Sequence, residues 1–501
     1  MSVQLTLNGH PIRVDDVDPH LSALSWLRRA GYTGTKEGCS EGECGACAIA
    51  VMRRNVQGQA GFQAINSCLV PLAALDGQDV VTVEGVAGPG GDLHPVQRAL
   101  VDEGGSQCGY CTPGFVVSLF CEYYRPGREG FDPESVSGNL CRCTGYRPIL
   151  DAGRSLGPPG SDDPWLARLP GTLATAGTAQ GAVTELPPGA DHARGGRRFV
   201  RPTTLTEIFG RLAEDPAATL IAGGTDLMVR ANQSDLQFGT LLSLEAVPEL
   251  RAFAPGPEAL IVGAGLTLSD LEARVALDPE LARELPIIHQ LLWLFSSRLI
   301  RNRATLGGNL GTASPIGDSP PVLLALDAEV TLASAHGRRT LPLREYFRGY
   351  RQTALGVGEL IVELRLPRPF AKVQRFYKVS KRVLDDISTV AAAFALDLAP
   401  DGRVHRLRIA YGGIAATPIV AQAAEELAVG RPWNAETVEL LADAVAGLGT
   451  PMSDHRGSAA YRRAMTVSLL RKFFDDTTGP DTAPEAPSAP RVEGTLPGTL
   501  P

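Results

Sequence analysis

The chain has 501 residues, of which 44% are apolar and 20% charged, a composition typical of a folded globular protein long enough for about three domains. Its formal net charge of −8 argues against a nucleic-acid-binding surface. No stretch approaches the length of apolar sequence that spans a membrane, and the N-terminus has no basic segment followed by an apolar one. We therefore expect no membrane span, no nucleic-acid partner and a cytoplasmic location.

Residues 1–85 predict a small α+β domain. A hairpin is expected around Asn8-Gly9, and a helix around Ala23–Ala30. The other short β-type runs alternate apolar and polar residues and lie between turn signals. The expected strands are Val3–Leu7, Ile12–Val14, Ala48–Met52 and Val80–Val83.

Four cysteines in this region have the spacing of a plant-type [2Fe–2S] loop, C-x4-C-x2-C followed by a distant fourth cysteine. They are Cys39, Cys44, Cys47 and Cys68. Gly42, Gly45 and Ala46 keep the loop small, so that backbone N–H groups can point at the cluster sulfurs. A zinc site is the alternative, although zinc usually takes two C-x2-C pairs.

Residues 86–155 predict a helical domain that carries four more cysteines. These are Cys108, Cys111, Cys141 and Cys143, and each pair comes just before a helical stretch. Helix N-termini lower thiolate pKa values and suit a negatively charged cluster. Beside the first motif this group indicates a second [2Fe–2S] cluster, whereas alone it could hold zinc. Cys121, the ninth cysteine, lies in an apolar helical run and is interpreted as a core residue.

The rest of the chain contains no cysteine. Residues 156–197 are rich in Pro, Gly and Ala and predict a linker. Strands then alternate with helical segments over 198–370, and an α+β segment follows over 371–475. Six prolines between 476 and 501 predict a disordered tail.

Two glycine-rich stretches stand out in this half, "TLIAGGTDLMV" (219–229) and "RNRATLGGNLGTASPIGDSPP" (301–321). Such turns can bring backbone N–H groups against a pyrophosphate. Neither stretch is a G-x-G-x-x-G fingerprint, so ordinary turns are an equal alternative on the residues alone.

The stretches "EGCSEGECGACAIAV", "QCGYCTPGFV" and "GNLCRCTGYRPI" resemble the electron-transfer domains of the molybdenum hydroxylases, the family of xanthine dehydrogenase and aldehyde oxidase. The two glycine-rich stretches downstream extend the resemblance to that family's FAD domain. It implies four units: a ferredoxin-like β-grasp [2Fe–2S] domain, a four-helix [2Fe–2S] domain, a FAD domain of the vanillyl-alcohol-oxidase type and an α+β C-terminal domain.

The resemblance also implies roles for single residues. Two sets of residues would wrap the FAD diphosphate and ribityl chain. The first set is Leu220, Ile221, Ala222, Gly223, Gly224, Thr225, Asp226 and Leu227, and the second is Thr305, Leu306, Gly307, Gly308 and Asn309. Phe295 would stack on the adenine, Asp318 would hydrogen-bond the cofactor, Ile361 would press on the flavin ring and Lys378 would contact the flavin. Gln107 would contact the pterin. Asp385 or Asp386 would lie near the flavin on the NAD side. Core packing is the alternative for Phe295 and Ile361, and a solvated loop for the two aspartates.

Full-length members of the family continue for several hundred residues that bind the molybdenum cofactor. We therefore expect the small subunit of a bacterial xanthine dehydrogenase, paired with a molybdopterin-binding large subunit in a heterotetramer of two small and two large subunits. Electrons from hypoxanthine or xanthine would pass through the Cys108 cluster and the Cys39 cluster, whose loop is expected to be the wetter, to FAD and then NAD. The alternatives are a subunit of another molybdenum hydroxylase acting on an aldehyde or N-heterocycle, and a free-standing flavin electron-transfer protein.

Overall fold

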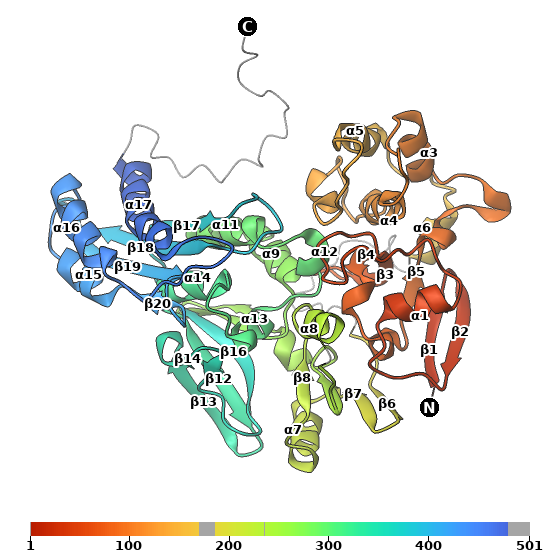
Figure 1. Ribbon diagram of the computed structural model, residues 1–501, viewed down its shortest axis with the longest axis horizontal. Coiled ribbons are helices and arrows are strands. Elements are labelled where there is room, and N and C mark those ends of the chain that lie inside the picture. The colour runs from red at the N-terminus through yellow and green to blue at the C-terminus, as the bar shows by residue number, and fades with distance from the viewer. Residues whose placement is uncertain (1, 170–185, 235, 479–501) are drawn as a thin grey trace, which may run out of the picture.

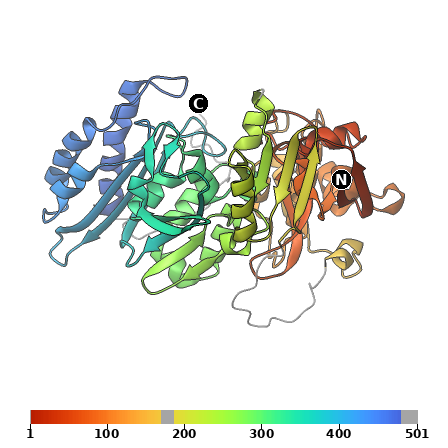
Figure 2. The ribbon, with the colours of Figure 1, turned by 90° about the horizontal axis from the view of Figure 1, so that it is seen from below.

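The N-terminal sheet and the helices α3, α4 and α5 (residues 95–155) lie side by side at one end of the long axis of the molecule, and the C-terminal helices lie at the other end (Figures 1 and 2). The computed structural model describes residues 2–169, 186–234 and 236–478. None of the helices in these ranges is long and apolar enough to cross a membrane.

The N-terminal unit is a five-stranded sheet in the order β2-β1-β5-β3-β4, with helix α1 packed on it. β1 pairs antiparallel with β2 but parallel with β5, which gives the β-grasp arrangement. Ser22 caps α1 by accepting a hydrogen bond from the backbone N–H of Ser25. The elements are β1 (Ser2–Leu7), β2 (His10–Asp15), α1 (Ala23–Arg29), β3 (Ala48–Arg54), β4 (Ala60–Asn66) and β5 (Asp79–Val81).

Strand β4 was not predicted from the sequence, and its burial explains why. Nearly all of its residues are buried, because Phe62 and its neighbours on one face pack against helix α4, while Ile65 on the other face belongs to the core of the N-terminal sheet. The Phe62 ring lies 4.9 Å from that of Phe120 in α4. A strand buried on both faces lacks the polar–apolar alternation that reveals a strand in a sequence.

The second unit is helical, and its long helix α4 is buried along almost its whole length against β3 and β4. Cys121 lies inside α4 in this core, as the sequence indicated. The four helices are α2 (Val83–Val86), α3 (Pro95–Asp102), α4 (Thr112–Tyr123) and α5 (Arg147–Ser155).

Part of the predicted linker is ordered. Helix α6 (Pro164–Arg168) packs Trp165 against Phe120, with ring centroids 4.8 Å apart, and β6 (Ala190–Arg194) already belongs to the next sheet. Residues 170–185 of this linker, and 479–501 of the predicted tail, lie outside the described residues. Helix α17 continues to Thr478, past the expected start of the tail at 476.

The third unit contains two sheets. The smaller has the order β6-β7-β9-β8, and β9 pairs parallel with both β7 and β8. The larger is antiparallel, in the order β10-β11-β16-β12-β13. The strands not yet located are β7 (Arg197–Arg201), β8 (Thr219–Ile221), β9 (Thr240–Ser243), β10 (Phe253–Pro255), β11 (Ala259–Gly263), β12 (Glu329–Ser334), β13 (Gly337–Pro342), β16 (Leu360–Pro367), and the small hairpin β14 (Phe347–Gly349) and β15 (Gln352–Thr353).

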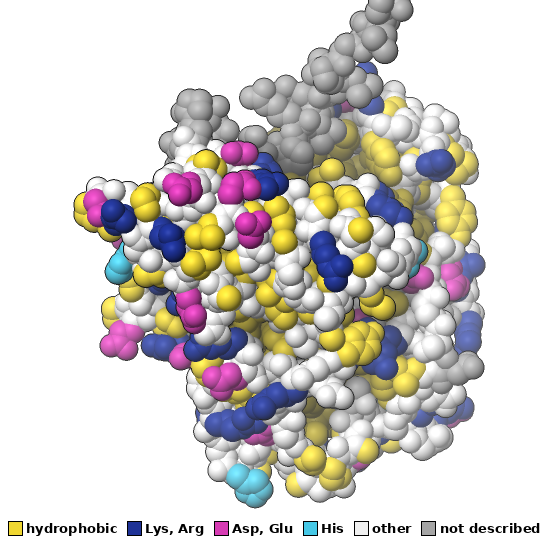
Figure 3. All heavy atoms as spheres, turned by 60° about the vertical axis from the view of Figure 1, so that its left-hand side comes forward, with side chains coloured by type: hydrophobic (Ala, Val, Ile, Leu, Met, Phe, Trp, Pro, Cys, Tyr) yellow, Lys and Arg dark blue, Asp and Glu magenta, His cyan; other side chains and the backbone are white. Residues whose placement is uncertain are grey.

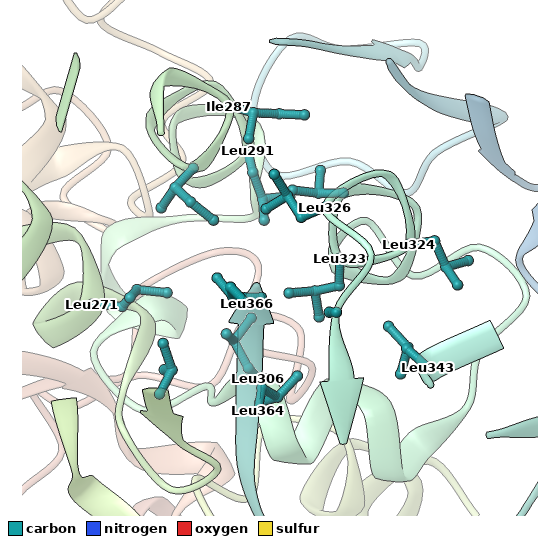
Figure 4. Packing of buried hydrophobic residues seen from close by; sticks show 14 of the residues in the cluster. Leu271, Ile287, Leu291, Leu306, Leu323, Leu324, Leu326, Leu343, Leu364 and Leu366 are labelled. Atoms are coloured by element: carbon teal, nitrogen blue, oxygen red, sulfur yellow. The ribbon is translucent and has the colours of Figure 1, made fainter. Parts of the chain in front are cut away.

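Helices surround these sheets and close the largest hydrophobic core. Leu306, at the start of α13, lies next to Leu364 and Leu366 of β16 (Figure 4), so this core holds the second glycine-rich stretch in place. The helices are α7 (Leu205–Glu214), α8 (Leu227–Gln233), α9 (Leu268–Ala276), α10 (Pro279–Glu284), α11 (Pro286–Leu294), α12 (Arg298–Arg301), α13 (Leu306–Thr312) and α14 (Ser319–Ala325).

The C-terminal unit is an antiparallel sheet, β17-β18-β19-β20, whose central strand is buried on both faces. In β18 one set of alternate residues, including Ala391 and Ala393, joins the core of the third unit (the FAD-type unit below), and the other set, including Phe394, packs under the C-terminal helices. Acidic and basic side chains are interspersed on the outer face of the molecule here (Figure 3). The elements are β17 (Val373–Val379), β18 (Val390–Leu398), β19 (Val404–Gly412), β20 (Ile419–Val420), α15 (Gln422–Ala428), α16 (Ala435–Ala446) and α17 (Ala459–Thr478).

Candidate iron–sulfur and flavin sites

The first four cysteines meet as two pairs of thiols. Cys47, just before β3, and Cys68, in the turn after β4, place their Sγ atoms 3.4 Å apart. Cys39 and Cys44 form the other pair, in which the Cys44 thiol is hydrogen-bonded to Cys39 and lowers the pKa of Cys39 to about 5. Each iron of a [2Fe–2S] cluster takes two thiolates, so a two-by-two grouping is the one such a cluster requires.

Glycine is required in this loop by lack of space. A Cβ atom at Gly45, whose φ is +65°, would lie 2.2 Å from the carbonyl oxygen of Gly138. At Gly42, whose φ is +85°, it would lie 2.4 Å from the Leu69 side chain. The sequence-based argument that small residues let the loop wrap closely is thus matched by the packing.

The second four cysteines show the same pairing, Cys108 with Cys143 and Cys111 with Cys141. Thr144 supports one of them, since its backbone N–H lies 3.4 Å from Cys141 Sγ. Among the described residues, no three His, Cys, Asp or Glu side chains lie close enough together to hold a metal ion at one point. The eight sulfurs stand as four pairs, and their role as the ligands of two clusters stays a prediction.

The two cysteine groups differ in solvent exposure. Cys108 and Cys143 are exposed, whereas Cys47 and Cys68 are buried and Cys39 and Cys44 partly so. In this chain by itself the Cys39 loop is therefore the less exposed of the two, and its exposure relative to the Cys108 group in a complex stays a prediction. The reason is that the FAD-type unit covers that loop. Gln107, expected at the pterin, is exposed beside Cys108.

The two cysteine loops interlock. The backbone N–H of Leu140, next to Cys141, donates to the carbonyl of Cys44 at 3.0 Å. The Asn139 side-chain amide donates to the Gly45 carbonyl at 3.1 Å. One hydrogen bond and a few covalent bonds thus connect a cysteine of one group to a cysteine of the other.

The first glycine-rich stretch presents a run of free backbone donors. None of the N–H groups of Gly223–Leu227 is hydrogen-bonded to a protein acceptor in the part of the chain that the structure describes. Gly224 has a φ of +79°, which lets successive N–H groups turn toward one side. Such a concave set of donors at the start of a helix suits the FAD diphosphate.

The second stretch lies directly against the first. A Cβ at Gly223 would lie 1.8 Å from the carbonyl oxygen of Arg303, whose Nε in turn donates to the Gly223 carbonyl at 3.2 Å. Thr312 Oγ1 lies 3.3 Å from the Asp226 carboxylate. Thr305 caps α13 by accepting from the Gly308 N–H at 2.9 Å. The structure therefore brings the two predicted flavin stretches, Leu220–Leu227 and Thr305–Asn309, together.

Two further predicted residues meet in a buried ion pair. Lys378 Nζ lies 2.7 Å from the Asp318 carboxylate and donates to the Leu294 carbonyl at 2.9 Å. Phe295 and Ile361 are almost fully buried in the core that also holds Leu306. The core-packing alternative for these two therefore remains open beside their expected flavin contacts.

The two adjacent aspartates differ in environment. Burial raises the pKa of Asp385 to about 6, and the charge of Glu43 in the first cysteine loop adds to the effect. Ser296 donates to one carboxylate oxygen of Asp385, while the other oxygen is buried without a partner among the described residues. Asp386 instead accepts from the backbone N–H groups of Arg382 and Ile387, both at 2.9 Å, and so shapes its own loop.

The contact between the first cysteine loop and helix α8 could not be foreseen. The Asn232 side chain donates to the carbonyls of Ser40 and Cys68, both at 2.9 Å, and Gln233 donates to that of Cys39 at 3.2 Å. These amides lie some 160 to 190 positions away in the sequence, and no motif marks them. They attach the Cys39 loop to the helix that follows the free N–H groups.

Four family descriptions match successive parts of the chain. Residues 5–73 match the 2Fe-2S iron-sulfur cluster binding domain, and residues 82–154 match the [2Fe-2S] binding domain. Residues 194–369 match the FAD binding domain in molybdopterin dehydrogenase, and 375–477 match the CO dehydrogenase flavoprotein C-terminal domain. The four fold units expected from the sequence are confirmed.

Among curated relatives, the xanthine dehydrogenase of Emericella nidulans is 34% identical over 95% of this chain and 38% of its own length. Xanthine dehydrogenase 1 of Arabidopsis thaliana is 32% identical, over 94% of this chain and 39% of its own. The chain thus spans about two fifths of the length of these relatives.

Solved structures with the same fold include a carbon monoxide dehydrogenase from Hydrogenophaga pseudoflava, 28% identical with a TM-score of 0.51 over 55% of this chain and 94% of that one. The quinoline 2-oxidoreductase of Pseudomonas putida 86 is 29% identical with a TM-score of 0.50, over 55% of this chain and 94% of that one.

Proposed function

Because this chain belongs to the molybdenum hydroxylase family, whose two iron–sulfur domains and FAD-binding domain it carries, we propose that it is the electron-transfer subunit of a xanthine dehydrogenase. In this role it takes electrons from a molybdenum site on a partner subunit and passes them to NAD, so that hypoxanthine and xanthine are oxidised to urate. The xanthine dehydrogenases among its relatives support this choice.

The main support for this proposal is that the two cysteine groups and the flavin stretches follow one another in space. The exposed Cys108 group interlocks with the Cys39 group through the Leu140–Cys44 hydrogen bond, and α8 fixes the Cys39 loop beside the free N–H groups of Gly223–Leu227. We propose the eight cysteines as the ligands of two [2Fe–2S] clusters. Bound FAD supplies the chemistry that turns single electrons into a hydride for NAD.

The residues of this chain hold and orient these groups. The free N–H groups would bind the FAD diphosphate, and the close approach of Gly223 to Arg303 keeps the two flavin stretches in register. The Lys378–Asp318 pair fixes both side chains at the same place. Asp385 accepts a hydrogen bond from Ser296, the neighbour of Phe295, and we propose it, before Asp386, as the aspartate that acts near the flavin.

The partner subunit would cover the exposed end of the chain. Around Cys108 and Cys143 the side chains of Tyr110, Leu140 and Tyr146 are 50, 41 and 38% exposed. Exposed aromatic and aliphatic side chains beside exposed cluster ligands are typical of an interface that is completed by another chain. We propose a molybdopterin-binding large subunit here, beside Gln107, in a heterotetramer of two copies of each.

A second candidate is the equivalent subunit of an enzyme that hydroxylates an aldehyde or an N-heterocycle. The structural likeness to the quinoline 2-oxidoreductase favours it, because that enzyme shares the flavoprotein fold. Substrate choice would lie in the partner subunit in either case.

The test uses the complex isolated with its partner subunit. We expect molybdenum, iron and FAD in it, and NAD reduction that depends on xanthine. Cys141→Ser should abolish NAD reduction while xanthine oxidation persists with a dye that accepts electrons at the partner subunit. Cys121→Ser, the matched control away from the ligand sets, should retain both. Aldehyde- or quinoline-dependent reduction without a response to xanthine would favour the second candidate, and a colourless, iron-free complex would reject both.

A further inference from the structure

A second contact joins the two cysteine loops. The Lys36 ammonium donates a hydrogen bond to the carbonyl of Gly109 at 2.9 Å. In the opposite direction, the Tyr110 hydroxyl donates to the carbonyl of Glu37. Gly109 and Tyr110 are the two residues inside the C-x2-C motif of the second cysteine group, and Lys36 comes shortly before Cys39 of the first. The contact therefore connects the loop of one expected cluster to the loop of the other.

Lys36 is held at both ends of its side chain. Its backbone N–H donates to the carbonyl of Ala46 at 3.0 Å, inside its own cysteine loop. Its ammonium lies 5.1 Å from the centroid of the Tyr110 ring, within the range of a cation–π interaction. The Lys36 side chain is half-buried. The ammonium is therefore kept beside the second cysteine loop instead of extending into water.

The positive charge of Lys36 forms no ion pair with a carboxylate among the described residues. Its neighbour Glu37 uses its own carboxylate to accept from the Ser40 hydroxyl at 2.7 Å. A [2Fe–2S] cluster held by four thiolates is negatively charged, and its reduction potential depends on net charge, hydrogen bonds and exposure. With the clusters bound, their thiolates would supply the counter-charge that Lys36 lacks.

We propose that Lys36 is a positioning residue for electron transfer between the two clusters, and that its charge raises the reduction potential of the Cys108 cluster. This inference rests on the proposed function, since it takes the eight cysteines as cluster ligands. Reduction adds negative charge to a cluster, and a fixed positive charge nearby stabilises the reduced form. The Cys108 cluster is affected more than the Cys39 cluster, because the ammonium donates to the backbone between two ligands of the former.

Lys36 then sets how a single electron is shared between the two clusters. When the electron moves on, the Cys108 cluster is oxidised and the Cys39 cluster is reduced, so the step needs no further reactant. Without the lysine charge the shared electron moves toward the Cys39 cluster. We expect the equilibrium constant between the two clusters to change by at least about tenfold, which corresponds to about 59 mV for one electron.

The experiment is a redox titration of the full chain loaded with its clusters and FAD, followed through the paramagnetic signals of the reduced clusters. The signal that Cys141→Ser removes identifies the Cys108 cluster. K36M should lower the midpoint potential of this signal, relative to that of the other cluster, by at least about 59 mV. K36R keeps the charge and should restore most of the potential. K372M, the matched control, removes the charge of an exposed lysine beside β17 and should shift neither signal.

A further variant, Y110F, separates the charge from the contact. It removes the hydrogen bond to the Glu37 carbonyl but keeps the ring beside the ammonium, so both potentials should stay close to those of the wild type. If K36M loses iron, K36Q, which is also neutral but can still donate toward Gly109, gives the same comparison.

The inference is overturned by unshifted potentials in K36M or K36Q, by an equal shift in K372M or Y110F, or by a shift in K36R as large as that in K36M. A wild-type chain that holds no iron would overturn the proposed function and this inference with it. Full iron content in every variant with unshifted potentials would overturn this inference alone.

Discussion

The two flavin stretches can contact each other because residue 223 is glycine and has no side-chain carbon. A Cβ atom there would lie 1.8 Å from the Arg303 carbonyl oxygen, far inside any allowed contact, and the obstacle is backbone rather than a flexible side chain. Gly45 has the same role between the cysteine loops, where the obstacle is the Gly138 carbonyl. Both glycines are needed for close approach between segments that are far apart in the sequence.

Gly223→Ala should therefore lower FAD occupancy to less than half, because the two stretches must separate to admit the methyl group. Gly311→Ala in α13 is the matched control, since an added Cβ there meets nothing within 4 Å. The ratio of flavin absorbance to protein checks both variants. Full FAD retention in Gly223→Ala would contradict the assignment of these stretches to the cofactor.

Asp385 predicts a pH dependence of stability. Its pKa of about 6 is above the value of about 3.9 in an unfolded chain. As the pH rises, the Asp385 carboxyl therefore loses its proton at a higher pH in the folded state than in the unfolded chain. The free energy of unfolding falls between about pH 4 and 6 and stays lower above pH 6. Asp385→Asn should remove this penalty and raise the free energy of unfolding by about 1–2 kcal/mol at pH 8, with little effect at pH 4.

Asp386→Asn supplies the control, with the opposite sign. Although partial burial acts to raise it, the backbone N–H groups of Arg382 and Ile387 hold the pKa of Asp386 below its ordinary value. Removing the negative charge of Asp386 should lower the free energy of unfolding at pH 8 and lower it less at pH 4. Unfolding curves of the FAD-loaded chain at both pH values give the comparison, and the same sign for the two variants would refute the environments assigned to them.

Among the helices, strands and loops, the sequence predicted those features that a short local sequence pattern encodes. The cysteine spacing and the glycine-rich turns marked residues that the structure brings together as pairs of thiols and as a run of free N–H groups. Strand β4 was missed because both of its faces are buried. The Cys39 loop was expected to be the wetter, yet in this chain by itself it is the less exposed, because the covering helix α8 comes from another unit. What escaped prediction depends on contacts between distant segments, which no local pattern records.

Helix α8 yields a prediction of this kind. Asn232→Ala removes the hydrogen bonds to the carbonyls of Ser40 and Cys68, each worth about 1 kcal/mol. We expect cluster and FAD contents to stay as in the wild type, while transfer of electrons from the Cys39 cluster to FAD slows several-fold because the loop moves relative to α8. Rapid-mixing absorbance follows this step. Gln422→Ala removes an exposed amide that donates to Glu426 on the surface and is the control, and equal rates in all three proteins would rule out the role.

At the scale of the whole molecule, the order of the units depends on how firmly they are joined. The N-terminal unit is attached to the FAD-type unit by the fully buried Arg201, which donates to the carbonyls of Ala74 and Asp76, each at 2.7 Å. The helical unit is attached by Glu134, whose carboxylate is paired with Arg298 and Arg301 of α12. Such fixed joints hold the cysteine groups and flavin stretches at constant separations, which an electron path requires.

Glu134→Gln tests the second joint. Arg301 is completely buried and Glu134 nearly so, and the Arg301 guanidinium also donates to the Phe295 carbonyl at 2.9 Å. Removing the carboxylate charge leaves Arg301 buried without its counter-charge, which typically costs about 3–5 kcal/mol. We expect the melting temperature to drop and the helical unit, followed through its cluster absorbance, to unfold before the flavin is released. Glu439→Gln, which breaks an exposed pair with Arg471, should change neither. A single unchanged transition in Glu134→Gln would show that the units are held together by their apolar contacts alone.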